Sequence, residues 1–125
     1  SPRKLGQVLI NLLVNAGQAI ASHGSITIST GTERDDAGLK WITISVADNG
    51  SGISPKVLDN IFQPFFTTKP VGLGTGLGLY ISLTIMKTMG GDIKVTSVVN
   101  KGTTFTLYLP DQNTRQAQSG ASCND

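Results

Sequence analysis

The sequence predicts an α+β domain, built as a two-layer sandwich in which a mixed, mostly antiparallel sheet is covered on one face by about three helices. Two observations predict it. The regular elements follow the order helix, two strands, short helix, loop, helix, two strands. The predicted strands alternate apolar and polar residues, and the first helix carries a single apolar stripe. Elements with one apolar face bury it against each other in layers.

The first helix is predicted to start at Ser1-Pro2, an N-cap residue followed by proline at the first helical position. One side of its helical wheel is expected in the core and holds Leu5, Leu9, Leu12, Leu13, Ala16 and Ile20. The opposite face carries uncharged carboxamides: Gln7, Asn11, Asn15 and Gln18. Because a solvated helix face normally carries Lys and Glu, this row predicts contact with something polar.

Two strands are predicted next, over 25–30 and 41–48, from their alternating Ile and Val residues. The polar, acidic segment 31–40 between them is predicted to be a surface loop. Ser54-Pro55 then repeats the cap-and-proline signal, and a short helix toward Phe62 is expected.

The second half of the chain predicts one more helix and two more strands. The helix runs from Leu79 to Met89, is mostly apolar and is expected to be largely buried, with Gly90-Gly91 as its C-terminal cap. The strands cover 92–98 and 103–109, and Asn100-Lys101-Gly102 between them is a good hairpin turn.

The folded domain is expected to span residues 1–110, with 111–125 as a polar, disordered tail. The chain of 125 residues is long enough for one hydrophobic core. Its net charge is +2 and its ten Lys and Arg are scattered, which argues against a nucleic-acid or membrane footprint. Cys123 is the only cysteine, so no internal disulfide is possible. No apolar run approaches the roughly 20 residues that span a bilayer.

A glycine stands at every second position from Gly72 to Gly78. Glycines before a helix are typical of a phosphate-binding loop, because backbone N–H groups and the helix dipole favour an anion. The spacing matches neither a Walker loop nor a dinucleotide loop. A mobile surface loop is the alternative.

Four stretches combine with this loop: NLLVNAGQA from Asn11, DNGSGI from Asp48, FQPFFTTK from Phe62 and GLGTGLGL from Gly72. In this order they resemble the N box, first glycine box, F box and second glycine box of the ATP-binding catalytic domain of sensor histidine kinases. That family shares the Bergerat fold with gyrase, mismatch-repair and chaperone ATPases. The resemblance extends from about Leu5 to Pro110. The sequences NAGQA and FFTTK, together with the few residues between Phe66 and Gly72 that would form a short lid, resemble the nitrogen-regulation type of sensor kinase.

The resemblance implies a site for ATP and Mg²⁺. Asn15 is the implied Mg²⁺ ligand, since a carbonyl oxygen suits this hard ion. Asn11, one turn earlier, supports the phosphates or a metal-bound water, and these two are the implied catalytic residues. Gln18 is also expected at the ATP. Many sensor kinases have Lys and then an aromatic residue where Gln18 and Ala19 stand here, so this chain departs from the pattern. The alternative for the carboxamides is a polar outward face.

The other boxes complete the implied ATP site. Asp48 accepts a hydrogen bond from the adenine amino group, which predicts a preference for ATP over GTP; an ordinary Asp-Asn-Gly turn is the alternative. Phenylalanines of the third stretch are expected to pack in the core. Lys69 is expected to reach a phosphate, with a solvated lysine as the alternative. The remaining implied contacts are Gly50, Gly52, Ile53, Phe65, Thr68, Gly72, Gly74, Thr75, Gly76, Leu77 and Gly78.

The resemblance also implies the reaction. Gyrase-like ATPases carry a glutamate as general base at the position of Asn11, and a carboxamide has no useful basicity near neutral pH. A neutral imidazole needs less help as a nucleophile. The implied function is therefore transfer of the γ-phosphoryl group to a histidine on a separate dimerisation domain. A response regulator follows indirectly, no nucleic acid or direct membrane contact is expected, and the isolated domain is expected to be cytoplasmic, monomeric and unable to phosphorylate itself. A non-catalytic nucleotide-binding or interaction module and a slow ATPase are the alternatives.

Overall fold

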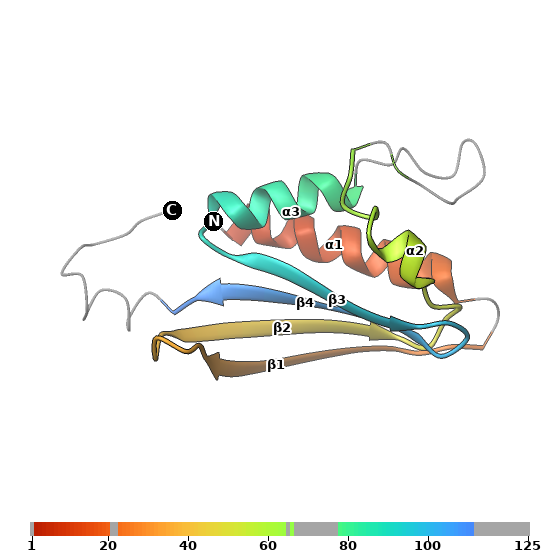
Figure 1. Ribbon diagram of the computed structural model, residues 1–125, viewed down its shortest axis with the longest axis horizontal. Helices are drawn as coiled ribbons and strands as arrows, with labels where there is room; N and C mark the ends of the chain where they lie inside the picture. The colour runs from red at the N-terminus through yellow and green to blue at the C-terminus, as the bar shows by residue number, and fades with distance from the viewer. Residues whose placement is uncertain (1, 21–22, 65, 67–77, 112–125) are drawn as a thin grey trace.

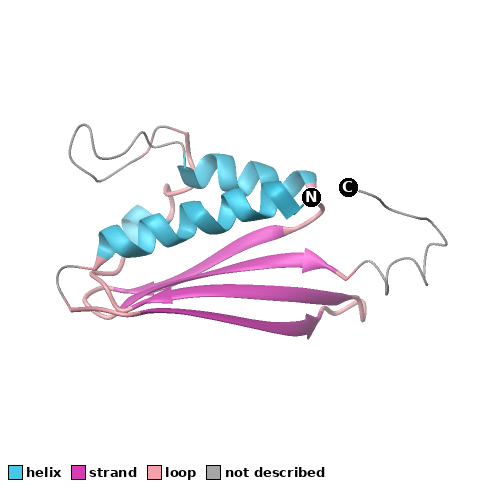
Figure 2. Ribbon diagram, turned by 180° about the vertical axis from the view of Figure 1, so that it is seen from behind, coloured by secondary structure: helices cyan, strands magenta, loops and turns pink. Residues whose placement is uncertain are grey.

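The computed structural model describes residues 2–20, 23–64, 66 and 78–111 (Figure 1). Within them a four-stranded sheet forms one layer, and the helices form the other layer on one of its faces (Figure 2). The predicted fold class is confirmed. In chain order the elements are α1 (Pro2–Ala19), β1 (Ile26–Arg34), β2 (Lys40–Asp48), α2 (Pro55–Leu58), α3 (Gly78–Thr88), β3 (Asp92–Val98) and β4 (Gly102–Pro110).

The strands lie in the order β1-β2-β4-β3, and each of the three neighbouring pairs is antiparallel. In the central pair, Val46 of β2 lies opposite Phe105 of β4, and Asp48 lies opposite Thr103. Val46 and Phe105 are buried and point to the helices. Because side chains alternate between the two faces of a sheet, the residues just before and after each of them point to the open face.

The core lies between the two layers. It is made of fully or almost fully buried residues from α1, α3, the sheet and the segment after α2: Val8, Leu12, Ala16, Val46, Ile61, Met86, Ile93, Phe105 and Leu107. Leu5, Leu9 and Leu13 pack against this core and are partly buried. The predicted apolar stripe of α1 is therefore the buried one, with Val8 added to it. Phe62 packs edge-on against Phe105, with ring centroids 6.3 Å apart, as its core assignment predicts.

The predicted loop over 31–40 is too long, because β1 continues to Arg34 and β2 begins at Lys40, which leaves a mostly exposed turn over 35–39. Every residue of β1 is exposed, since this strand forms an edge of the sheet. Its polar composition reflects that exposure, and the pairing with β2 still makes it a strand. The turn that remains is held by Asp35, whose Oδ1 accepts the backbone N–H groups of Ala37 and Leu39 at 3.0 and 2.9 Å.

The prediction that the helix α3 is largely buried is wrong. Only Ser82 and Met86 of it are buried, whereas Tyr80 and Ile81 are 41% and 37% exposed. One face of α3 packs on α1 and the sheet, and no further layer covers the other face within the described residues (Figure 1). The helix α1 ends at Ala19, so Ile20 lies beyond it.

The turn between β3 and β4 and the start of α2 agree with their predictions. Asn100 has a φ of 66° and Gly102 a φ of 136°, which are positions that Asn and Gly tolerate. Ser54 stands at the N-cap position of α2 with an extended backbone, followed by Pro55, and its side chain makes no capping hydrogen bond. No helix in the described part of the chain is long and apolar enough to cross a membrane. The predicted tail over 112–125 lies outside the described residues.

Candidate functional site

The sequence-predicted site residues that the structure describes gather toward one end of the molecule. There the second half of α1, the end of β2 at Asp48 and the start of α3 at Gly78 lie together (Figure 1). The two helices run in opposite directions, so the C-terminal half of α1 meets the N-terminus of α3. The predicted contacts Phe65, Thr68, Lys69, Gly72, Gly74, Thr75, Gly76 and Leu77 lie outside the described residues.

Asp48 is half-buried at the end of β2, and the turn that follows it fixes its carboxylate. The backbone N–H of Gly50 donates to Asp48 Oδ1 at 2.9 Å. Asn49 reaches back to the start of β1, because its Oδ1 accepts the backbone N–H of Ser25 at 2.8 Å. The bond from Gly50 engages one carboxylate oxygen. The ordinary Asp-Asn-Gly turn is thus present, and it orients a carboxylate at the edge of the candidate site.

The segment 50–53 after this turn is attached to α1. The backbone N–H of Ser51 donates to the carbonyl of Ala19 at 3.1 Å, just where α1 ends. A Cβ on Gly50 would meet that same carbonyl oxygen. Gly52 has a φ of 75°, and a Cβ there would meet the carbonyl of Val98. The two glycines therefore allow close approach of the protein's own backbone.

The same segment is also attached to the β3–β4 hairpin. The backbone N–H of Ile53 donates to Ser97 Oγ at 2.7 Å. Ser97 Oγ in turn lies 2.8 Å from Thr103 Oγ1 and donates to the carbonyl of Gly102 at 2.9 Å. Thr103 is buried and lies opposite Asp48 in the sheet. The hydroxyl groups thus connect the loop after Asp48 to the strand beside it.

The four carboxamide residues of α1 differ in their exposure to solvent. Gln7 and Gln18 are exposed, which agrees with a polar outward face, whereas Asn11 and Asn15 are half-buried. Asn11 Nδ2 donates to Ser82 Oγ of α3 at 3.1 Å. The two asparagines are four residues apart, so they stand one above the other on the helix.

The donor set fits Mg²⁺ better than a soft metal. Within the described ranges, no group of three or more His, Cys, Asp or Glu residues could hold a metal by itself. Two half-buried carboxamides would supply neutral oxygen ligands, and a nucleotide's phosphates would supply the charged ones. The residues present therefore fit an ion that arrives with a triphosphate.

Three residues that hold this arrangement do not emerge from sequence reasoning: Ser82, Ser97 and Thr103. Ser97 and Thr103 are paired across the hairpin. The predicted turn at Asn100 implies their pairing, so counting outward from the turn finds them. Ser82 offers a weaker signal, a lone serine on the inner side of a mostly apolar helix.

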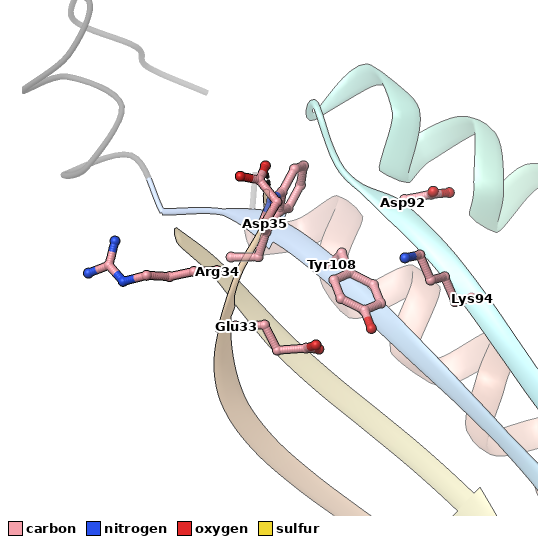
Figure 3. A pocket seen from close by; sticks show the side chains of 7 residues that line it. Glu33, Arg34, Asp35, Asp92, Lys94 and Tyr108 are labelled. Carbon is pink, nitrogen blue, oxygen red and sulfur yellow. Dashed lines mark hydrogen bonds between the residues drawn. The ribbon is translucent and has the colours of Figure 1, made fainter. Parts of the chain in front are cut away.

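A separate hollow of about 270 Å³ lies on the open face of the sheet, near the opposite end of β2 (Figure 3). Seven residues line it: Glu33, Arg34, Asp35, Trp41, Asp92, Lys94 and Tyr108. Trp41 is seven residues before Asp48 on β2, a distance of about 23 Å along a strand. None of the predicted site residues lines the hollow.

Several polar groups of this hollow contact one another. Trp41 Nε1 donates to Asp35 Oδ2 at 3.0 Å, and Lys94 Nζ lies 4.8 Å from the centroid of the Tyr108 ring. Burial raises the pKa of Tyr108, and the hydrogen bond to Glu33 together with the negative charges of Glu33 and Asp92 raises it further. Arg34 and Asp92 have partners beside the hollow, the carbonyl of Gly38 and the ammonium of Lys87. The hollow is thus a surface cluster at the far end of the sheet whose polar groups have partners in the protein.

Comparison with known proteins decides the family. A model of the family described as histidine kinase-, DNA gyrase B-, and HSP90-like ATPase matches residues 1–113. The chain belongs to this ATPase family. Membership accounts for the two-layer fold, and ATP is the ligand of domains in this family.

Curated relatives in this ATPase family are sensor kinases. Sensor histidine kinase ZraS of Escherichia coli strain K12 is 48% identical over 119 residues, which are 95% of this chain and 24% of ZraS. Signal transduction histidine-protein kinase AtoS of the same organism is 48% identical over 106 residues, 85% of this chain and 16% of AtoS. The chain thus spans a quarter or less of the length of these relatives.

Solved structures with this fold are also from histidine kinases. The catalytic domain of histidine kinase ThkA is 36% identical with a TM-score of 0.71, over 86% of this chain and 66% of that one. Full-length ShkA in complex with AMPPNP is 31% identical with a TM-score of 0.71, over 86% of this chain and 21% of that one. The fold of this chain is therefore that of histidine kinase catalytic domains.

Proposed function

We propose that this domain binds ATP together with Mg²⁺ and delivers the γ-phosphoryl group to a histidine on a separate dimerisation domain, as the catalytic part of a two-component sensor histidine kinase. The observation that carries the proposal is the carboxamide of Asn11, which is bound to Ser82 where a gyrase-like ATPase has its glutamate base. A carboxamide cannot take a proton from water near neutral pH. The relatives ZraS and AtoS, which are named sensor histidine kinases, support the same function.

Asp48 is the proposed adenine-selecting residue. Its carboxylate, oriented by Gly50, accepts a hydrogen bond from the 6-amino group of adenine. Guanine presents a carbonyl oxygen at that position, which a carboxylate repels. Gly50, Gly52 and Ile53 form the segment against which the base lies. The complex of ShkA with AMPPNP, an analogue of ATP, supports a nucleotide as the ligand.

The phosphates are assigned to the other side of the site. Asn15 holds Mg²⁺, Asn11 holds a phosphate or a metal-bound water, and Gly78 begins a helix whose N-terminus favours an anion. Mg²⁺ supplies neutralisation of the triphosphate charge. The acceptor imidazole nitrogen forms the new bond to the γ-phosphorus as the bond to the ADP oxygen breaks. The further proposed ATP contacts are Gln18, Phe65, Thr68, Lys69, Gly72, Gly74, Thr75, Gly76 and Leu77.

Calorimetric titration with ATP and GTP, each with and without Mg²⁺, tests the assignment. Wild type is expected to prefer ATP. Asp48→Asn is expected to weaken ATP binding roughly 10–100-fold, because a hydrogen bond to a charged group is lost, and to reduce the preference over GTP. Asn15→Ala is expected to abolish the Mg²⁺ dependence. Asp36→Asn, an exposed carboxylate in the β1–β2 turn, is the matched control and should bind as wild type does.

Mixing the domain with the helical dimerisation domain of the same kinase and radiolabelled ATP tests the transfer. Label on a histidine of that domain is expected, and none on the catalytic domain alone. Nucleotide binding without transfer would favour the non-catalytic module. Steady phosphate release that disappears in Asn15→Ala would favour a slow ATPase. Label on the isolated catalytic domain would contradict the proposal.

A further inference from the structure

The hydrogen bond between Asn11 and Ser82 joins α1 to α3 across 71 positions of sequence. Ser82 is a polar residue, yet it is completely buried on the inner side of α3 beside apolar core residues such as Met86. A hydroxyl in such a place is unfavourable unless it is hydrogen-bonded. The carboxamide of Asn11 donates a hydrogen bond to its oxygen. A buried serine therefore forms a hydrogen bond here that an alanine or a valine could not form.

In the structure the carboxamide takes one orientation in this bond, with its nitrogen as the donor and the serine oxygen as the acceptor. The two ends of an Asn side chain have nearly the same shape, but only the oxygen end accepts a hydrogen bond or binds a cation. Ser82 Oγ lies 3.1 Å from Nδ2, so the nitrogen end of Asn11 is turned toward α3. Oδ1 is then on the other branch of the planar amide, turned away from Ser82.

Ser82 stands one helical turn after Gly78, the residue that opens α3 after the glycine loop. Any displacement of the first turn of α3 relative to α1 therefore acts on the Asn11 side chain. Thr84, two residues further on, has no such role, because its Oγ1 donates to the carbonyl of Tyr80 in its own helix at 2.9 Å.

We propose that Ser82 is a positioning residue of the site: it holds Nδ2 of Asn11 against α3, so that Oδ1 is presented to the metal-bound water or phosphate. This inference rests on the proposed function, in which Asn11 serves the Mg²⁺–ATP end of the site. Ser82 does not touch the nucleotide and acts through Asn11 alone.

The first test uses the nucleotide-free domain. In ¹H–¹⁵N spectra, the Nδ2 protons of Asn11 are identified by their loss in Asn11→Asp, and their exchange with water is measured. Protection in wild type is expected to fall about 10-fold or more in Ser82→Ala and to be kept in Ser82→Thr, which retains the hydroxyl. The control Thr84→Ala should leave it unchanged. Equal exchange in wild type and Ser82→Ala would overturn the proposal, whether or not the domain binds ATP.

The second test is calorimetric and uses a double-mutant cycle. Ser82→Ala is expected to reduce the Mg²⁺-dependent part of ATP affinity about 10-fold, the usual effect of losing a residue that orients a ligand, with little change in binding without metal. In the Asn11→Ala background, Ser82→Ala should have no further effect. Additive effects, or an unchanged Mg²⁺ dependence in Ser82→Ala, would refute the positioning role while the proposed function stands. A wild type without any Mg²⁺ dependence would contradict the proposed function instead, and the exchange test would still decide on Ser82.

Discussion

The glycines at positions 50 and 52 allow close approach both of a ligand, as the sequence predicts, and of the protein's own backbone. In the sequence they stand in a glycine box and predict close approach of a ligand. In the structure, the place of a Cβ at Gly50 is taken by the carbonyl of Ala19, and at Gly52 by the carbonyl of Val98. Both glycines are therefore needed to seat the Asp48 loop on α1 and on the β3–β4 hairpin, with or without a ligand.

Tyr108 carries a prediction on the pH dependence of stability. Its pKa is raised above the ordinary value of 10.0, chiefly by burial and then by Glu33. The unfolded chain therefore releases the phenolic proton at a lower pH than the folded chain does. The stabilisation from Tyr108 is complete below about pH 10 and is lost as pH rises through the folded pKa. Urea unfolding from about pH 9 to about pH 11 should show a steeper loss of stability for wild type than for Tyr108→Phe.

Tyr80→Phe provides the control for this titration, because Tyr80 is an exposed tyrosine on α3. It should follow the wild-type curve of stability against pH. A Tyr108→Phe variant that lost stability as steeply as wild type would refute the role given to Tyr108.

In the β1–β2 hairpin, local composition is a poor guide to the secondary structure of a whole element. The outer half of the hairpin has the polar, acidic composition of a loop, yet all nine residues of β1 pair with β2. Strand formation here depends on the partner strand, so composition alone misassigns it. At the turn, the Asp35 carboxylate accepts hydrogen bonds from the backbone N–H groups of Ala37 and Leu39 and from the indole Nε1 of Trp41.

Replacement of Asp35 is therefore expected to loosen the end of this hairpin. Asp35→Ala removes three hydrogen bonds and should lower the free energy of unfolding by about 1–2 kcal/mol, since exposed bonds contribute modestly. Urea unfolding followed by the fluorescence of Trp41, the only tryptophan, measures it. The amides of Ala37 and Leu39 should also exchange faster.

Asp36→Ala is the matched control, one residue along the same turn. It should change the free energy of unfolding by less than about 0.5 kcal/mol, as surface substitutions usually do. Equal losses for the two variants would mean that Asp35 contributes through charge rather than through its hydrogen bonds.

In the molecule as a whole, the described residues form one hydrophobic core, between the helices and the sheet, and stability depends on it. Leu12 lies in this core and is fully buried, whereas Ile10 on the same helix is 62% exposed. Leu12→Ala is expected to lower the free energy of unfolding by about 2–5 kcal/mol through lost burial and a cavity. Ile10→Ala should change it by less than about 0.5 kcal/mol.

Urea unfolding of both variants makes this comparison, with circular dichroism as the probe. A loss for Ile10→Ala as large as that for Leu12→Ala would indicate that the outer face of α1 is covered as well, which would contradict the two-layer description.

Local patterns in the sequence determine the elements and much of the candidate site. The apolar stripe of α1, the alternation of β2, β3 and β4 and the turn at Asn100 depend on neighbours in sequence, so periodicity predicts them. The asparagines of α1 and the Asp48 turn are local in the same sense. No one of these stretches identifies a site alone, but the four stretches in order carry the family resemblance, and that resemblance implies Asn11, Asn15 and Asp48 as a candidate site.

Only the tertiary structure decides what holds these residues in place. Ser82 meets Asn11 across 71 positions, and Ser97 meets the loop at Ile53 across 44. The full length of β1 and the exposure of Tyr80 and Ile81 also depend on which segment lies beside them. These contacts join residues that are far apart in the sequence and depend on how the helices pack on the sheet. A pattern that repeats over a few residues reflects only local neighbours, so it does not predict them.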